Sequence, residues 1–182
     1  EKDGQCKHIF KFLQDSKVMN SPQDERYKQR KDFEQTADYV DNMLDSFQHL
    51  ICGSFRRNAP FLKDLDVVVL CVKEGDLTEL CERVALVGWI ESGGDRNITA
   101  KINNIQVDFK ICTNPNVWGS CIMHFTGSKT ENIRLRKVAS SKGMILSEYG
   151  LRDAKTQEII ASKTEEEIYE ALGEKFKTPA QR

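Results

Sequence analysis

Apolar residues repeat with a helical period in the first third of the chain. They follow one another at spacings of three and four, at Phe33, Ala37, Val40, Leu44 and Phe47. This spacing is typical of one face of an amphipathic helix. Ser21 and Pro22 have the residue types of an N-cap and a first helical position, so the pattern predicts a helix that begins there.

Shorter apolar runs then alternate with turn residues. The runs "HLICGS" (49–54), "LDVVVLCV" (65–72), "NITAKI" (97–102) and "IQVDFKIC" (105–112) are predicted strands. Asn103 and Asn104 lie between the last two, and because asparagine tolerates positive φ they predict a hairpin turn. Between the second and third strands, "DLTELCERVALV" (76–87) has a capping-box spacing of Asp76 and Glu79 and predicts a second helix.

The pattern changes after Cys112. Asn114 and Pro115 predict a helix start, and "ENIRLRKVASSKG" predicts a helix that ends at Gly143. "MILSEYGL" and "TQEIIA" are predicted short strands, and Thr164 with Glu167 caps a helix over "EEEIYEALG". The chain is therefore expected to be α+β, with an N-terminal segment (1–20), a first unit (21–112) and a smaller α+β unit (113–182).

Net charge, hydropathy and cysteine pattern limit the kinds of protein that this chain can be. The 182 residues include 27 Lys and Arg against 28 Asp and Glu, a net charge of −1, so any nucleic acid must bind local basic patches. No apolar run is long enough to span a membrane, and we expect a soluble intracellular protein. The six cysteines include no C-x-x-C pair, which favours reduced core thiols over disulfides or zinc.

Carboxylates inside apolar strands are the strongest chemical signal. Asp64 and Asp66 point to one face of a predicted strand, and Asp108 lies in another apolar strand. An unpaired buried charge is costly, so either a metal ion or the upstream arginines must compensate the charges of Asp64 and Asp66. The alternative is that their strand is only a solvated edge. If the strands are neighbours, the three acids converge and suit Mg²⁺. Ser54 and Arg57, on a Gly-Ser turn, suit phosphate groups.

The order and spacing of these motifs resemble the family X DNA polymerases, typified by DNA polymerase β. "GSFRR" is followed, seven residues after Arg57, by the Asp64 of "KDLDVVV", then by "VDF", "FTGS" and "RLR". The resemblance runs from about Cys52 to the C-terminus and is strongest to the bacterial and archaeal members. It implies a polymerase β-like nucleotidyltransferase palm, with a mixed sheet flanked by helices, followed by a small α+β thumb.

The resemblance also implies roles for individual residues. Asp64, Asp66 and Asp108 correspond to the catalytic ligands of two Mg²⁺ ions, for which Mn²⁺ substitutes, with Asp108 beside the primer hydroxyl. The residues that correspond to dNTP contacts are Gly53, Ser54, Arg57, His124, Phe125, Thr126, Gly127, Lys129 and Asn132. Those expected to contact DNA or the template are Arg134, Arg136 and Lys137.

The sequence also departs from the family pattern. Polymerase β has tyrosine where this chain has His124, and arginine where it has Gln106. The sequence before Gly53 is too short for the family's lyase domain and helix-hairpin-helix fingers, so we expect a minimal palm and thumb without these domains or a phosphoesterase domain. This minimal layout is similar to the compact polymerase of African swine fever virus, and an excised core is the alternative. The basic run "RYKQRK" (26–31) either grips DNA phosphates or is a solvated helix face.

The resulting functional hypothesis is an enzyme. We expect a monomeric, template-directed DNA polymerase that acts on gapped or primer-template DNA with dNTPs, in short-gap base excision repair. A template-independent nucleotidyltransferase would carry the same palm motif. A non-catalytic DNA-binding scaffold is the alternative from another class, and the three intact aspartates argue against it.

Overall fold

The computed structural model describes residues 28–182, which form two units. Within the described residues, the first unit comprises 28–51 and Pro60–Thr113, and the second comprises Cys52–Ala59 and Asn114–Arg182. The "GSFRR" turn, which the sequence assigns to the first unit, thus belongs to the second. The predicted segment 1–20 and the predicted helix start at Ser21 lie outside the described residues.

The first unit is built on a five-stranded mixed sheet. Its elements are β1 (Lys28–Gln29), α2 (Arg30–Met43), β2 (His49–Ile51), β3 (Phe61–Leu62), β4 (Asp64–Leu70), α4 (Asp76–Val87), β5 (Trp89–Gly93), β6 (Asn97–Ile102) and β7 (Ile105–Cys112). The strand order is β2-β4-β7-β6-β5, in which β4 and β7 are parallel and the other pairs antiparallel. The short strands β1 and β3 pair separately. The predicted mixed sheet flanked by helices is confirmed.

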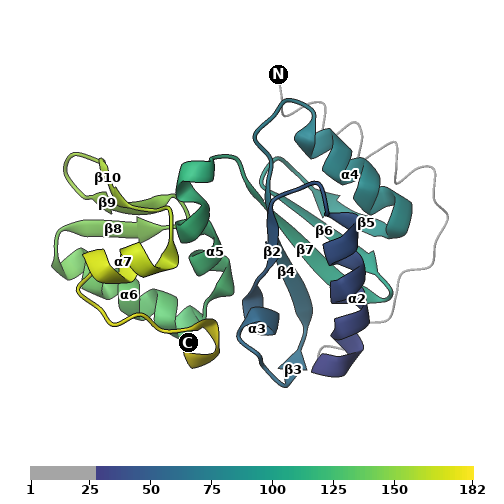
Figure 1. The fold of residues 1–182 in the computed structure, drawn as a ribbon, viewed down its shortest axis with the longest axis horizontal. Helices are drawn as coiled ribbons and strands as arrows, with labels where there is room; N and C mark the ends of the chain where they lie inside the picture. The colour runs from purple at the N-terminus through teal and green to yellow at the C-terminus, as the bar shows by residue number, and fades with distance from the viewer. Residues whose placement is uncertain (1–27) are drawn as a thin grey trace. The chain divides into compact units, whose positions relative to one another are not determined.

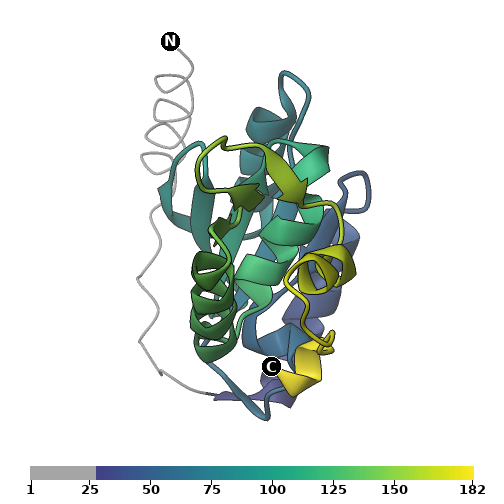
Figure 2. The same ribbon diagram turned by 90° about the vertical axis from the view of Figure 1, so that its left-hand side faces the viewer.

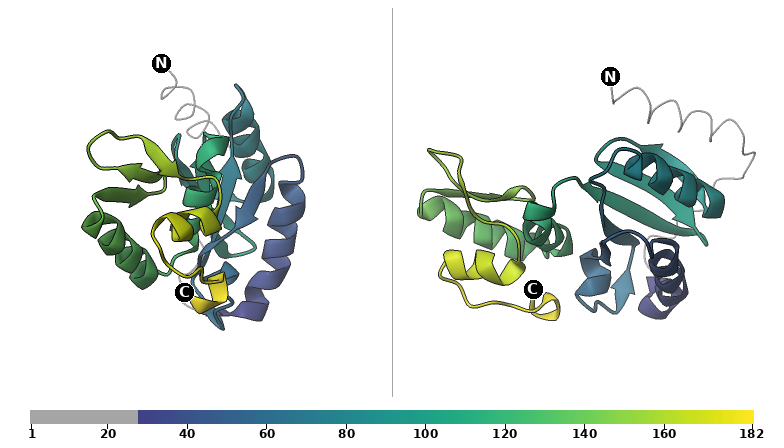
Figure 3. Two further views of the ribbon diagram at one scale, coloured as in Figure 1. Left: turned by 60° about the vertical axis from the view of Figure 1, so that its left-hand side comes forward. Right: turned by 45° about the horizontal axis from the view of Figure 1, so that its top comes forward.

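The two long helices of this unit cover one face of the sheet, as Figures 1 and 3 show for α2 and α4. Alternate residues along β4, such as Leu65 and Val67, are fully buried, as are Phe33 of α2 and Leu80 of α4. Because side chains alternate along a strand, the residues between them in β4, including the aspartates, lie on the opposite face. The helices thus bury one face and leave the other for polar side chains.

The structure corrects two local predictions in this unit. Lys28 and Gln29 form β1, so the predicted long helix begins at Arg30 in the described chain. Asp76 is not the N-cap of α4; Gly75 is, and the Asp76 carboxylate instead accepts hydrogen bonds from the preceding loop's backbone. The predicted hairpin turn is confirmed, because Asn103 and Asn104 both have positive φ between β6 and β7.

The second unit is a small α+β arrangement, most of which is coloured green to yellow in Figure 2. It contains α3 (Gly53–Arg56), η1 (Pro115–Val117), α5 (Trp118–Thr126), α6 (Lys129–Ser141), β8 (Met144–Ser147), β9 (Gly150–Asp153), β10 (Ile159–Ala161), α7 (Glu165–Ala171) and η2 (Pro179–Gln181). The strands form an antiparallel sheet in the order β10-β9-β8. The stretch "MILSEYGL", predicted as one strand, makes both β8 and β9, because Glu148 and Tyr149 form a turn.

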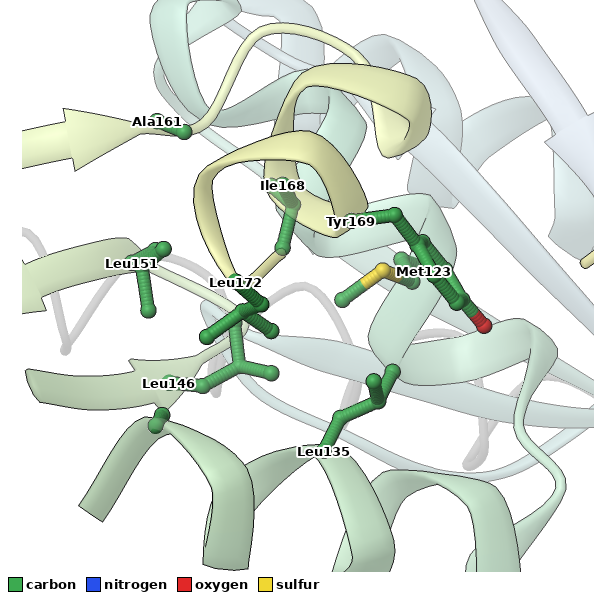
Figure 4. Packing of buried hydrophobic residues seen from close by; sticks show 9 residues of the cluster. Met123, Leu135, Leu146, Leu151, Ala161, Ile168, Tyr169 and Leu172 are labelled. Atoms are coloured by element: carbon green, nitrogen blue, oxygen red, sulfur yellow. The ribbon is translucent and has the colours of Figure 1, made fainter. Parts of the chain in front are cut away.

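A hydrophobic core joins the helices of this unit to its sheet (Figure 4). The buried side chains converge from every layer of the unit: Met123, Leu135, Ala139, Leu146, Leu151, Ala161, Ile168, Tyr169 and Leu172. The predicted cap of α7 is confirmed, since the Thr164 side chain accepts a hydrogen bond from the Glu167 backbone. α6 has an N-cap of the same kind, at Ser128.

Close packing in the second unit requires a glycine at position 119. A Cβ placed on Gly119 would lie 2.4 Å from the backbone nitrogen of Thr164, the N-cap of α7. Helix α5 therefore approaches the start of α7 only because residue 119 has no side chain. In this way the sequence fixes the distance between two helices that lie far apart along the chain.

Among the described residues, no helix is both long and apolar enough to cross a membrane. Five cysteines in this part of the chain are buried and form no disulfide, at positions 52, 71, 81, 112 and 121.

Candidate functional site

Strand register brings the three predicted acids to one face of the first unit's sheet. Asp66 of β4 is the direct partner of Asp108 in the parallel strand β7, and Asp64 is the partner of Gln106. Asp64 lies two residues before Asp66, so alternation places both on the face that carries Asp108. Neighbouring strands lie about 4.8 Å apart, which puts the acids on adjacent backbones. The sequence predicted this only on condition that the two strands were neighbours.

Asp108 is held by hydrogen bonds to both carboxylate oxygens. Thr99 Oγ1, on β6, donates to Oδ1 at 2.6 Å, and Gln106 Nε2 donates to Oδ2 at 3.0 Å. Only 9% of the residue is exposed, and a buried carboxylate needs such donors. Because Thr99 is the antiparallel register partner of Asp108, the sheet itself sets this contact.

The acids also affect one another electrostatically. Burial raises the pKa of Asp64, and the negative charge of Asp108 raises it further, while Lys63 and Lys110 act in the opposite direction. Like charges raise a carboxyl pKa because ionising one acid disfavours ionising the other. A bound cation would relieve this repulsion.

The strand register brings the backbones of the three acids together, but their side chains do not form a metal centre. In residues 28–182, no three His, Cys, Asp or Glu side chains gather closely enough to hold a metal ion. Carboxylate oxygens are nevertheless the hard ligands that Mg²⁺ prefers, and each can accept more than one contact. By donor chemistry the three aspartates therefore fit a divalent cation, which would have to draw their side chains together.

The predicted phosphate-binding turn lies in the second unit. Ser54 belongs to the short helix α3, which Arg57 ends. The Arg57 Nη1 atom donates a hydrogen bond to the Thr126 carbonyl at 2.5 Å. The neighbouring Gly127 has φ +70°, and a Cβ there would lie 3.2 Å from the same Nη1 atom. The "GSFRR" and "FTGS" motifs are thus joined through an arginine and need glycine at position 127.

Arg56 and Glu165 form a buried connection that the sequence did not predict. Arg56 donates to Thr126 Oγ1 at 2.8 Å and makes two hydrogen bonds to the Glu165 carboxylate, at 2.9 and 2.7 Å. Arg182 Nη1 donates to the same carboxylate at 2.6 Å, and its side chain is fully buried. The position of Arg56 in the "GSFRR" motif, directly before Arg57, was a visible signal for this residue. Nothing in the run of three glutamates, however, distinguishes Glu165 from its neighbours.

Burial raises the pKa of Glu165, but the hydrogen bonds from Arg56 and Arg182 outweigh it and leave this pKa lowered. Glu165 is therefore a buried anion held between two cations. It fixes the first arginine of the "GSFRR" motif, and through it the hydroxyl of Thr126.

His124, Asn132 and Arg136 form a second predicted group, at the end of α5 and along α6. The Asn132 side-chain amide donates to the His124 carbonyl at 2.8 Å, and Arg136 Nη2 lies 3.1 Å from His124 Nδ1. These three residues line a small pocket together with Ser120, Met123, Leu146 and Ser147. His124, Phe125 and Thr126, which the resemblance implies as dNTP contacts, complete helix α5, and the chain leaves the helix at Gly127.

The basic residues predicted to contact DNA or the dNTP differ in their contacts within the protein and in their exposure. Arg134 makes ion pairs with Glu131 at 2.8 Å and Glu174 at 2.5 Å. Arg136 and Lys137 are exposed on α6, as is Lys129 in its first turn. The structure thus gives Arg134 two carboxylate partners, while the other three basic side chains lie at the surface, where Arg136 contacts His124.

Comparison with known proteins gives matches of two kinds. Residues 121–182 match the family model described as DNA polymerase beta thumb. Over 141 residues the chain is 29% identical to DNA polymerase/3'-5' exonuclease PolX of Bacillus subtilis (strain 168), covering 74% of this chain and 25% of that protein. It is 27% identical over 138 residues to Repair DNA polymerase X of African swine fever virus (isolate Warthog/Namibia/Wart80/1980), covering 71% of this chain and 78% of the viral protein.

A third relative is DNA polymerase lambda of Rattus norvegicus. It is 24% identical over 162 residues, which cover 72% of this chain and 28% of the rat protein. The chain therefore spans about a quarter of the two cellular relatives and most of the viral one.

Proposed function

We propose that the chain is a template-directed DNA polymerase of short-gap base excision repair, a proposal supported by its similarity to DNA polymerases of family X. It would add a dNTP to the 3′-hydroxyl of a primer and release pyrophosphate. The observation that carries the proposal is the pairing of Asp66 with Asp108 in adjacent parallel strands, with Asp64 on the same face. A face with three carboxylates on one sheet is suited to binding cations beside phosphates.

The proposed reaction needs no covalent enzyme intermediate. The primer 3′-hydroxyl gives up its proton to solvent, and its oxygen forms a bond to the α-phosphorus of the dNTP. The bond from that phosphorus to the β-phosphate oxygen breaks, and pyrophosphate leaves with its electron pair. Asp64 and Asp66 would hold a nucleotide-associated Mg²⁺, and Asp108 would share a second ion beside the primer hydroxyl. Bound divalent cations, Mn²⁺ included, neutralise the charge that develops in such a displacement.

We assign the nucleotide-binding roles to the second unit. The backbone of Gly53, the Ser54 hydroxyl and the Arg57 guanidinium would contact the triphosphate, since a guanidinium binds phosphate through charge-assisted hydrogen bonds. The C-terminal end of α5, from His124 to Thr126, and the following Gly127 would face the sugar. Lys129 and Asn132 would lie beside the incoming base, and the His124 carbonyl already orients the Asn132 amide.

Basic side chains of α6 would contact DNA. Arg136 and Lys137 are exposed on this helix, which suits phosphate or template contacts. Arg134 is assigned to DNA as well, although its ion pairs with Glu131 and Glu174 would have to be kept or exchanged. We propose that the protein acts as a monomer, which its mass in solution would test.

A single-nucleotide extension assay tests the proposal. The protein is given a gapped duplex, Mg²⁺ and each dNTP separately, and we expect incorporation only of the nucleotide complementary to the template base. Incorporation of all four dNTPs on a primer without template would instead indicate a template-independent transferase. DNA binding with no Mg²⁺-dependent incorporation would indicate a scaffold.

A further inference from the structure

We propose that the hydroxyl of Thr99 is a positioning group for Asp108, an inference that rests on the proposed function. Thr99 lies on β6, within the first unit's sheet, directly opposite Asp108 on β7. Its Oγ1 donates to Asp108 Oδ1 at 2.6 Å. This distance is in the range of hydrogen bonds between a hydroxyl and an ionised carboxylate, which are stronger than those between neutral groups.

The side chain of Thr99 lies on the polar face of β6, opposite the face that carries its sequence neighbours. Ile98 and Ala100 are both fully buried on the side of the sheet that faces the helices. Valine would have the same shape as threonine and a comparable preference for a strand. Threonine differs from valine at this position by its hydroxyl, which donates a hydrogen bond to the Asp108 carboxylate.

The two donors on Asp108 complement each other. Thr99 holds Oδ1 and Gln106 holds Oδ2, so the carboxylate is fixed at both oxygens and cannot rotate without losing a bond. An ionised carboxylate has about four acceptor sites, so one hydrogen bond to each oxygen leaves acceptor sites for a cation. Both donors are uncharged, and they orient Asp108 without cancelling its negative charge.

Removing the Thr99 hydroxyl should therefore misplace Asp108 without unfolding the sheet. In Thr99→Val, Gln106 would still hold one oxygen, and the other would be free to turn away. A misoriented ligand weakens cation binding and slows the chemical step, because reacting groups that are displaced by about 1 Å can cost about a hundredfold in rate. Binding of the dNTP, which depends on other residues, should change little.

Three variants test the inference: Thr99→Val, Thr99→Ser and, as a matched control, Thr78→Val on helix α4 of the same unit. Single-turnover incorporation into a gapped duplex gives the rate and the dNTP dissociation constant separately. We expect Thr99→Val to slow incorporation at least tenfold with the dNTP constant changed less than about threefold. Thr99→Ser should recover most of the rate, and Thr78→Val should resemble the wild type.

A second readout does not depend on polymerase activity. Mn²⁺ alone is titrated into each variant and followed by electron paramagnetic resonance, and thermal unfolding checks folding. Weaker Mn²⁺ binding in Thr99→Val, restored in Thr99→Ser, would support the positioning role even if the wild type incorporated no nucleotide.

Two results would overturn the inference. Equal loss in Thr99→Val and Thr99→Ser would show that packing matters and the hydroxyl does not. Unchanged Mn²⁺ binding and rate in Thr99→Val would show that Asp108 needs no help from Thr99. A wild type that bound no Mn²⁺ would overturn it together with the assignment of the three aspartates as ligands.

Discussion

Asp108 is a buried carboxylate in the middle of a strand, and its surroundings orient it. It is 9% exposed, it accepts a hydrogen bond on each oxygen, and it is the register partner of Asp66. A buried carboxylate of this kind is costly to retain unless its charge is used or compensated. Its two neutral donors orient the charge and do not neutralise it, which is consistent with use by a cation.

We predict that Asp108→Asn abolishes incorporation and largely preserves dNTP binding. The amide keeps the size of the side chain but loses the charge, while Asp64 and Asp66 can still hold a nucleotide-associated ion. Single-turnover kinetics on a gapped duplex measure both quantities, with Asp38→Asn on the exposed side of α2 as the control. A rate loss of less than about tenfold, or ~1.4 kcal/mol in the barrier, would remove Asp108 from the catalytic set.

Arg57 gives a second prediction at the residue scale. Arg57→Ala should weaken dNTP affinity by about 10- to 150-fold, since a hydrogen bond to a charged group contributes about 1.5–3 kcal/mol. The change also removes the bond to the Thr126 carbonyl, so thermal unfolding is measured alongside. Arg152→Ala, which removes bonds to the Tyr149 carbonyl in the same unit, is the control.

The outcome for DNA decides between two roles of Arg57. DNA affinity should be nearly unchanged in Arg57→Ala. If the variant lost DNA affinity and kept dNTP affinity, Arg57 would be a DNA contact and the phosphate-binding role would be wrong.

At the scale of elements, a charged cluster ties α6 to the segment that follows α7. Glu131, in the first turn of α6, is 5% exposed and accepts hydrogen bonds from Arg134, Lys177 and the Tyr169 hydroxyl. Glu174 accepts another from Arg134. The sequence indicated a basic, DNA-facing helix here, and the structure shows that part of its charge holds the second unit together.

This cluster predicts acid sensitivity. The hydrogen bond from Arg134 is the main cause that lowers the pKa of Glu131 from 4.5 to about 2, against the effect of burial. A carboxyl group whose pKa is lower in the folded than in the unfolded chain stabilises the fold at pH values above its pKa in the unfolded chain. This stabilisation is lost as the pH falls from about 4.5 to about 2. The contribution is fully present at neutral pH, where Glu131 is ionised in both the folded and the unfolded chain.

Glu131→Gln should therefore lower the free energy of unfolding at pH 7 and flatten its decline between pH 5 and pH 2. Urea unfolding at a series of pH values measures this, and exposed Glu170→Gln on α7 serves as the control. If the free energy of unfolding fell equally steeply between pH 5 and pH 2 in the wild type and in Glu131→Gln, another carboxylate would dominate acid unfolding.

At the scale of the whole molecule, the balance of charges limits the DNA binding that we propose. Basic and acidic residues nearly cancel, 27 against 28, so affinity must come from patches such as the exposed part of α6. The run 26–31 is a second patch; its described residues Lys28 and Gln29 are in β1, and Arg30 lies 3.6 Å from Glu34. Few phosphate contacts are expected from surfaces of this size.

We predict a shallow salt dependence of DNA affinity. Each neutralised phosphate contributes a slope of about −0.9 in log affinity against log salt for duplex DNA, so a slope of about −3 to −5 is expected. Replacing Arg26, Lys28, Arg30 and Lys31 together by alanine should flatten it by about one or two units if this run contacts DNA. Fluorescence anisotropy over a salt series measures the slope, with Lys73→Ala and Lys155→Ala combined as the control. An unchanged slope would make the run a solvated surface and leave binding to α6.

The sequence by itself determined those features that depend on neighbours along the chain. Short apolar runs between turn residues indicated strands of the sheet, the spacing of Asp76 and Glu79 indicated α4, and the two asparagines at 103 and 104 indicated the hairpin. The cap of α7 at Thr164 followed from a spacing of three residues. The order and spacing of the motifs also identified Asp64, Asp66 and Asp108 as candidates, because strand alternation is a local property.

Only the tertiary structure decided which distant residues meet. It paired β4 with β7, and so Asp66 with Asp108, and it placed Thr99 opposite the same acid. It also buried Glu165 between Arg56 and Arg182, and turned Arg134 toward Glu131 and Glu174. Strand order and ion-pair partners depend on how separate elements pack, and residue periodicity carries no record of that packing.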